Sequence, residues 1–240
     1  TWTVPSFTDN CAGGSIVRTT GPAPGSTFGL GVTNIVYTAT DASGNTSTCG
    51  FTVTVVDVTA PVVVSCPANI TVNEGVSCNA TASWTEPGVT DNCSGSTITR
   101  TAGPAPGGTF SLGATTVTYT ATDAAGNIST CSFTVTVVDV TAPTYVLCPG
   151  DQTINAAAGL CTALLPSPTF GFGDNCPGTT NAQVSGTSIS DPMPVGVHPV
   201  SFRLTDAAGN LSASTCNFTV TVVDNQAPTA FCQNITVNLG

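Results

Sequence analysis

Apolar residues alternate with threonine and serine in many short stretches of the chain. Every second residue is apolar in VTYTA (117–121) and in FTVTV (133–137). A period of two predicts half-buried antiparallel strands, and no stretch shows the 3.6-residue period of a helix. Clusters such as GPAPGG and DAAGN supply turns between the strands. In the middle of the chain we expect strands at 68–74, 77–85, 96–102, 108–112, 115–123 and 131–139.

The whole pattern occurs three times along the chain. Asp9, Asp91 and Asp174 each open a DNC motif, and these motifs lie 82 and 83 residues apart (91 − 9 and 174 − 91). Six or seven short strands in a unit of this length predict a two-sheet sandwich. We therefore expect an all-β fold of tandem immunoglobulin-like β-sandwich repeats, arranged as a linear rod. The expected domains are 1–60, a repeat lacking its first strand; 61–143, a complete repeat; 144–227, a complete but diverged repeat; and 228–240, the first strand of a further repeat.

Composition places the chain outside the cell. It has 240 residues with 11 cysteines and no CxxC pair, which favours structural disulfides in an oxidising compartment over zinc or redox sites. We expect an extracellular protein, secreted or attached to the cell surface. Three arginines, no lysine and a net charge of −10 exclude nucleic acid as a partner. No apolar run approaches the ~18 residues of a membrane span, so direct membrane insertion is not expected.

Four sequence motifs point to a known family. CPANITVN, DNC, PGGTFSLGATTVTYTATDAAGN and CSFTVTVVD closely resemble the hyalin repeat (HYR), an immunoglobulin-like module of extracellular and cell-surface proteins. The resemblance covers nearly the whole chain and implies adhesion, matrix or stalk roles without catalytic residues. The only histidine, His198, has no serine and aspartate arranged around it as a catalytic motif. We therefore expect that the protein is not an enzyme.

The cysteines of a complete repeat allow three pairings. Animal hyalin repeats often keep only the two that match Cys66 and Cys131, and the resemblance therefore implies that these two pair. We then expect Cys78 to pair with Cys93. The third repeat would follow the same scheme, with Cys148 bonded to Cys216 and Cys161 to Cys176. Three cysteines remain as candidates for bonds between repeats or subunits, namely Cys11, Cys49 and Cys232.

Acidic residues recur at fixed places in the repeat. Asp91 and Asp123 lie in loops that should face the preceding repeat, which ends near Asp57. Carboxylates in loops are ligands that Ca²⁺ prefers. The alternative is that these aspartates cap turns through their side chains. No cofactor is required by this fold, and Ca²⁺ is the ion that we consider for Asp57, Asp91, Asp123, Asp139, Asp174 and Asp206.

The last segment of the chain has the sequence of a first strand. Residues 230–239 place Phe231, Ile235 and Val237 among polar residues, while the first repeat lacks the corresponding strand. We expect that this segment of one copy completes the first repeat of the next copy by strand addition, with a disulfide between Cys232 and Cys49. The alternative is that the same joint is made within a longer chain. In both cases the principal partner is the protein itself.

Two functions remain after these arguments. The leading hypothesis is a structural segment of a cell-surface filament or stalk built from tandem repeats. The rival is a spacer or an adhesive binding region of a larger protein, with glycans or other surface proteins as partners. Two tryptophans and three tyrosines provide little material for an exposed aromatic binding patch.

Overall fold

The computed structural model describes residues 1–238 and contains only strands, turns and loops in that range. The described residues include no helix that is long and apolar enough to span a membrane. The first repeat contains β1 (Ser15–Thr20), β2 (Gly31–Thr40) and β3 (Thr46–Val55). The second contains β4 (Val62–Val64), β5 (Ile70–Asn73), β6 (Asn79–Thr81), β7 (Gly88–Thr90), β8 (Thr97–Ala102), β9 (Thr109–Ser111), β10 (Gly113–Thr122) and β11 (Ile128–Val138). The third contains β12 (Thr144–Leu147), β13 (Gln152–Asn155), β14 (Thr162–Ala163), β15 (Gly171–Gly173), β16 (Thr180–Gly186), β17 (Met193–Pro194), β18 (Gly196–Thr205) and β19 (Cys216–Val223).

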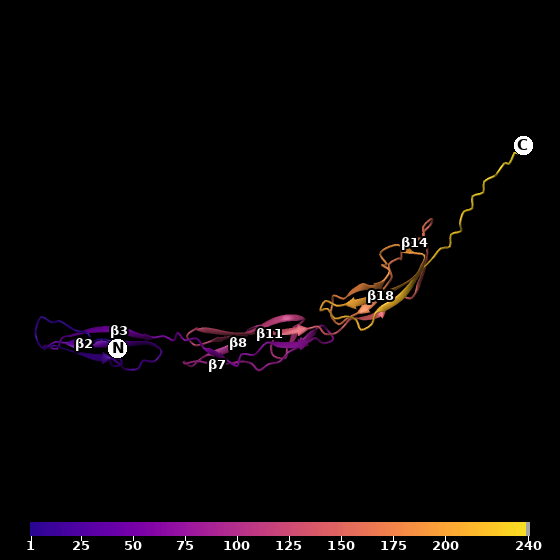
Figure 1. Ribbon diagram of the computed structural model, residues 1–240. Coiled ribbons are helices and arrows are strands. Elements are labelled where there is room, and N and C mark those ends of the chain that lie inside the picture. The colour runs from indigo at the N-terminus through magenta and orange to yellow at the C-terminus, as the bar shows by residue number, and fades with distance from the viewer. Residues whose placement is uncertain (239–240) are drawn as a thin grey trace. The chain divides into compact units, whose positions relative to one another are not determined.

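The second and third repeats have the same sheet topology, which confirms tandem immunoglobulin-like sandwiches. Their larger sheets follow the orders β5-β11-β10-β8 and β13-β19-β18-β16 (Figure 1). The first long strand of each repeat runs parallel to the last one, with Ile70 opposite Val135 and Gln152 opposite Val220. The shorter pairs β4-β7 and β6-β9 belong to the second repeat, and β12-β15 and β14-β17 are their counterparts in the third.

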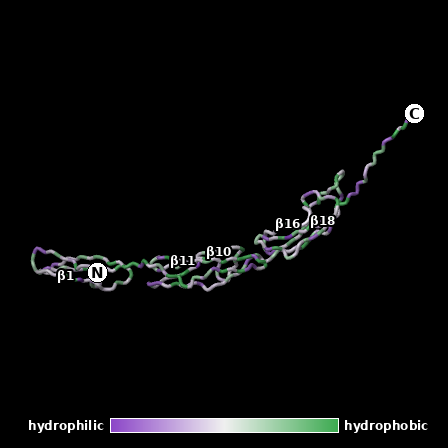
Figure 2. Tube along the Cα trace, viewed as in Figure 1, coloured by the Kyte–Doolittle hydropathy of each residue, from purple (hydrophilic) through white to green (hydrophobic). Residues whose placement is uncertain are grey.

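Burial follows the two-residue alternation that predicted the strands. Along β11 the apolar residues are buried and the intervening ones are at least partly exposed. Figure 2 shows the same alternation as changes between green and paler or purple positions along the trace. The expected strand at 77–85 is reduced to β6, while β4 and β7 were not expected. These strands have only three residues each, too few for a periodic pattern to be recognised.

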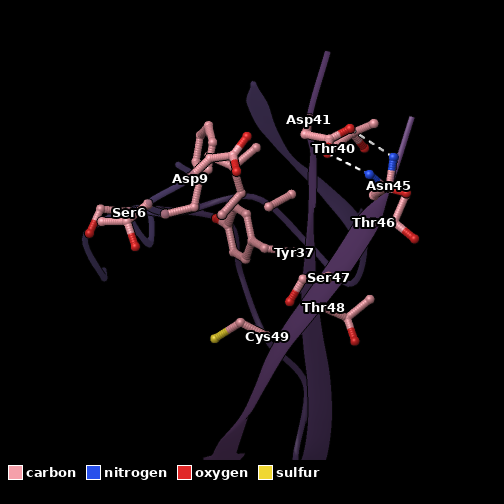
Figure 3. Close-up of a pocket in the computed structure, with 14 residues that line it drawn as sticks. Ser6, Asp9, Tyr37, Thr40, Asp41, Asn45, Thr46, Ser47, Thr48 and Cys49 are labelled. Carbon is pink, nitrogen blue, oxygen red and sulfur yellow. Dashed lines mark hydrogen bonds between the residues drawn. The ribbon is translucent and has the colours of Figure 1, made fainter. Parts of the chain in front are cut away.

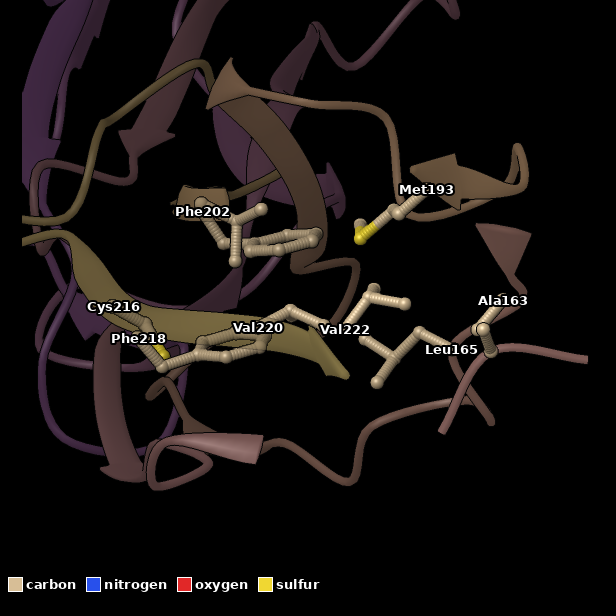
Figure 4. Packing of buried hydrophobic residues seen from close by; sticks show 10 residues of the cluster. Ala163, Leu165, Met193, Phe202, Cys216, Phe218, Val220 and Val222 are labelled. Atoms are coloured by element: carbon tan, nitrogen blue, oxygen red, sulfur yellow. The ribbon is translucent and has the colours of Figure 1, made fainter. Parts of the chain in front are cut away.

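Aromatic residues fill the centre of each complete repeat. In the second, Trp84 meets Phe110 and Phe133 edge to face, with ring centroids 6.1 and 5.1 Å apart. In the third, Phe202 and Phe218 stack in parallel at 6.1 Å. Figure 4 shows this pair beside Met193, Val220 and Leu165. These clusters hold together the scaffold from which the loops project.

The chain divides into two compact units, and the second repeat contributes to both. The first unit comprises Thr1–Pro67, Thr85–Gly103 and Val117–Ser132. The second begins with Ala68–Trp84 and Pro104–Thr116 and continues from Phe133. The linker between the first two repeats and the loops that receive it therefore lie within the first unit. The corresponding linker and loops between the second and third repeats lie within the second unit.

Candidate functional site

Two disulfides join the start and the end of a repeat. Cys66 bonds Cys131 and Cys148 bonds Cys216, with Cα atoms 5.9 and 5.5 Å apart. These are the pairs that the family resemblance implied. They connect neighbouring parallel strands, because each first cysteine precedes β5 or β13 and each second cysteine lies in β11 or β19. Each bridge therefore staples the two ends of one repeat together.

The third disulfide connects two repeats. Cys78 of the second repeat bonds Cys176 of the third, with Cα atoms 4.9 Å apart. The expected pairs Cys78–Cys93 and Cys161–Cys176 are therefore wrong, and Cys93 and Cys161 have free thiols. The physical reason is position, because the loop of Cys78 reaches the DNC loop of the following repeat. Cys11, Cys49 and Cys232 are also free and exposed.

Three aspartates from separate segments meet where the second repeat receives its linker. Asp57 of the linker, Asp91 of the DNC loop and Asp123 of the DAAGN turn place ligand atoms within 4.8 Å of one another. Asp123 is only 6% exposed. Both carboxylate oxygens of Asp91 are buried and accept no hydrogen bond from the described residues. Sequence reasoning predicted this group, and the structure brings its three members together.

The cluster perturbs the groups around it. A hydrogen bond to Asp57 is the main cause that raises the pKa of the Cys93 thiol, and burial and the three carboxylates add to it. Burial opposes ionisation of Asp123, but hydrogen bonds from Asn127 and nearby backbone amides outweigh it, so the pKa of Asp123 is lowered. Asp123 is thus held as an anion by its own turn.

The third repeat contains the same cluster. Asp139, Asp174 and Asp206 again place ligand atoms within 4.8 Å of one another. Asp139 and Asp206 are 8% and 6% exposed. Burial, followed by the charges of Asp206, Glu74 and Asp174, raises the pKa of Asp139. The arrangement is therefore a property of the repeat.

Hydrogen bonds attach each linker to the turn of the next repeat. Asp123 accepts bonds from the backbone and side chain of Asn127 at 2.8 and 2.7 Å. The Asn127 amide also donates to the carbonyl of Asp57 at 3.1 Å and to that of Thr59 at 3.4 Å. Asn210 donates in the same way to the carbonyl of Asp139 at 3.2 Å. The expectation that these aspartates cap turns is confirmed for Asp123, and the turn also holds the linker.

Glu74 holds the other side of the second linker, which sequence reasoning missed. Its carboxylate accepts hydrogen bonds from the backbone amide of Val140, the hydroxyl of Thr141 and the side-chain amide of Asn175. The bond from Thr141 is the main reason that the pKa of Glu74 falls to about 2. The available signal was that Glu74 is one of only two glutamates in the chain.

A pocket in the first repeat marks where a first strand is absent. It is lined by Ser6–Asp9, Tyr37, Asp41–Asn45 and Cys49, and Figure 3 shows Tyr37 between the first segment and the strand that carries Cys49. In the second repeat, β4 pairs with the matching segment at Gly88–Thr90. Phe51, Val53 and Val55 of β3 are accordingly only half-buried, whereas their counterparts in β11 are buried.

The expected donor segment is unpaired. Phe231, Ile235 and Val237 are 92%, 86% and 75% exposed. The expected segment also extends to Leu239, and the last expected domain to Gly240, both of which lie outside the described residues. His198 contacts the carbonyl of Pro194 at 2.7 Å and the hydroxyl of Thr187 at 3.2 Å, contacts that suit a surface histidine between strands.

Comparison with known proteins gives consistent matches across the chain. The HYR domain profile matches residues 1–55, 56–137 and 138–222. Hyalin of Strongylocentrotus purpuratus is 35% identical over 244 residues, which cover 97% of this chain and 20% of that protein. Hyalin of Lytechinus variegatus is 35% identical over 241 residues, which cover 95% of this chain and 43% of that protein. The chain thus spans less than half the length of either relative.

Solved structures give weaker matches. The protocadherin GammaB4 extracellular domain aligns with 86% of this chain and 43% of its own, at 14% identity and a TM-score of 0.36. Drosophila N-cadherin EC1-3 aligns with 91% of both chains, at 9% identity and a TM-score of 0.34.

Proposed function

The chain belongs to the HYR domain family, and from this premise we propose that it is a structural segment of an extracellular filament or stalk. The coarser assignment, an extracellular adhesion-type repeat protein, agrees with the hyalin relatives and with the disulfides. The family and the fold are those of non-enzymatic repeats, and we extend this to the chain. Its role in this proposal is to transmit force and to set distance.

The observation that carries the proposal is the bridge between Cys78 and Cys176. The second and third repeats are already joined by the linker between β11 and β12. A second covalent connection restricts how far the two repeats can rotate about that linker. It also keeps them attached if the linker is cut. Neither property is needed by a module that only folds and binds alone.

The positions of the free cysteines indicate that this bridge repeats along a longer array. Cys93 occupies in the second repeat the place that Cys176 occupies in the third, and Cys161 occupies the place of Cys78. We therefore expect Cys93 to bond a preceding repeat and Cys161 a following one. The partners in this proposal are further repeats of the same kind.

Strand addition is a second candidate for how such an array is joined, and the pocket of Figure 3 favours it. The outer edge of β3 has no neighbouring strand among the described residues, and Cys49, which matches Cys131, is exposed there. An open edge beside a half-buried apolar face readily accepts an extended segment. A segment like 230–238 of a second copy would place Cys232 near Cys49. The other possible donor is the preceding part of a longer chain.

Electrophoresis of native material separates these two donors. Under denaturing, non-reducing conditions, separate subunits joined by Cys232 and Cys49 give a ladder that collapses on reduction to a monomer of about the 23.8 kDa chain mass. Cys49→Ser should abolish that ladder, and Cys11→Ser serves as a control for loss of an exposed thiol. A single very long chain that survives reduction would rule out strand exchange between copies.

The filament assignment itself is tested by immuno-electron microscopy. Antibodies against the 240-residue chain should decorate extended material on the outside of unpermeabilised cells. Labelling confined to the cell interior contradicts the proposal. Specific binding of the purified chain to a glycan, without any assembly in the micrographs, would instead support the rival function of an adhesive region.

A further inference from the structure

The cluster of Asp57, Asp91 and Asp123 concentrates negative charge without a cation from the protein. Three carboxylates lie within 4.8 Å of one another, in a chain with three arginines, no lysine and a net charge of −10. Like charges at this separation repel each other most strongly where water is excluded. Asp123 is more than nine-tenths buried, so this repulsion opposes docking of the linker that carries Asp57.

Asp91 gives a second and independent indication of a missing ligand. Both of its carboxylate oxygens are buried, and neither accepts a hydrogen bond from a described residue. Buried carboxylate oxygens without partners are rare and require an explanation. Turn capping explains Asp123, whose oxygens accept three hydrogen bonds from its own turn. It does not explain Asp91, whereas a cation between the three aspartates does.

The second cluster shows that the arrangement is inherited with the repeat. Asp139, Asp174 and Asp206 occupy the same three sequence positions and the same geometry. Asp57 and Asp139 each accept a bond from the amide two residues on, at 3.0 and 3.1 Å, which fixes the linker carboxylate in the same turn. A chance cluster of surface acids would not preserve all of these contacts.

We propose that Asp57, Asp91 and Asp123 bind one Ca²⁺ ion and that the second cluster binds another. Every protein ligand is a carboxylate oxygen, which suits a hard cation, and Ca²⁺ tolerates irregular coordination with water completing the shell. Mg²⁺ demands a near-ideal octahedron, and Zn²⁺ prefers nitrogen and sulfur ligands. The ion joins the incoming linker to two loops of the repeat that receives it. This inference does not depend on whether the protein forms a filament.

Equilibrium dialysis of the oxidised 240-residue chain against ⁴⁵Ca²⁺ tests the assignment. We expect two ions per chain, with dissociation constants of about 10⁻⁴–10⁻³ M as in other extracellular modules. Asp91→Asn should leave one ion, and Asp91→Asn combined with Asp174→Asn should leave none. Asp9→Asn is the matched control, because Asp9 opens the same DNC motif but is exposed and belongs to neither described cluster. It should retain both ions.

Several results would overturn the proposal. These are no bound ⁴⁵Ca²⁺ at about 10 mM, tenfold above the weakest such sites, equal stoichiometry in Asp91→Asn and Asp9→Asn, or displacement by equimolar Zn²⁺. If Asp91→Asn fails to fold, Asp57→Asn replaces it, because this residue lies on the linker outside the sheets. The melting temperature of the wild type should rise with Ca²⁺, and the part of this rise due to the first site should be lost in Asp57→Asn.

Discussion

The disulfides short-circuit most of the chain under tension, and this effect can be measured. From Cys66 to Cys216 the chain contains 150 residues (216 − 66), which would reach about 500 Å when fully extended. With the bridges intact, a pulled chain crosses from Cys66 to Cys131, follows 17 residues to Cys148 (148 − 131), and crosses to Cys216. This route contributes about 60 Å of chain plus two Cα–Cα spans of 5.9 and 5.5 Å.

Removing one bridge makes the measurement sensitive to the connection between repeats. In Cys66→Ser/Cys131→Ser, the shortest route runs 12 residues from Cys66 to Cys78 and then crosses to Cys176. It returns 28 residues to Cys148 before the final bridge, so this variant should reach about 150 Å. If Cys78 were bonded to Cys93 instead, the route would contain 67 residues, 12 up to Cys78 and 55 from Cys93 to Cys148, and reach about 240 Å.

Optical tweezers with handles at the two termini can resolve these lengths. The contour length between the first and last bridges should be about 70 Å in the oxidised wild type, about 150 Å in the variant and about 500 Å after reduction. Cys78→Ser/Cys176→Ser is the control, because it leaves the shortest route of the wild type unchanged. A length near 240 Å in the first variant would refute the bridge between repeats.

Three further predictions concern the linkers and the cores. Glu74 has a pKa of about 2 in the folded protein against 4.5 for the free group, so its stabilisation is complete above pH 4.5 and is lost as the pH falls through 2; Glu74→Gln should flatten this part of the unfolding-versus-pH curve. Phe133→Ala should reduce the free energy of unfolding by about 3–5 kcal/mol, and half-buried Phe51→Ala by about 1–2 kcal/mol, in urea titrations followed by circular dichroism. A reversed order would contradict the burial argument. Asn127→Ala should increase hydrogen exchange in the preceding linker, and Asn45→Ala, which has the same turn but no linker contact in the described structure, should not.

The long strands could be predicted because their pattern is local. A period of two identifies β8, β10 and β11 to within a few residues of their observed ends. The parallel contact of the first and last strands also follows from the sandwich fold. The three-residue strands β4, β6 and β7 depend on neighbours that are distant in sequence, so no local signal announces them.

The cysteine pairing between repeats illustrates a different limit. The three pairings considered for one repeat all assumed that a repeat closes its own disulfides. Cys78 and Cys176 are 98 residues apart, more than one repeat length, and only the geometry of the joint brings them together. The acidic clusters were easier to predict, because the carboxylates recur with the repeat and the fold places the two loops and the linker at the same end.

The joints are encoded in the repeats as fully as the sandwiches are. The linker sequence DVTAP is identical at 57–61 and 139–143, and the structure buries the final proline of both copies. The third copy reads DNQAP, and its Gln226 replaces the Thr141 that bonds Glu74. Ala156 has replaced Glu74 at that joint, and Gln226 bonds the backbone of Ala157 and Gly159 at 3.0 and 2.9 Å instead. A longer amide side chain thus restores a contact that the shorter alanine could not make, which is expected if docking of each linker is part of what the sequence specifies.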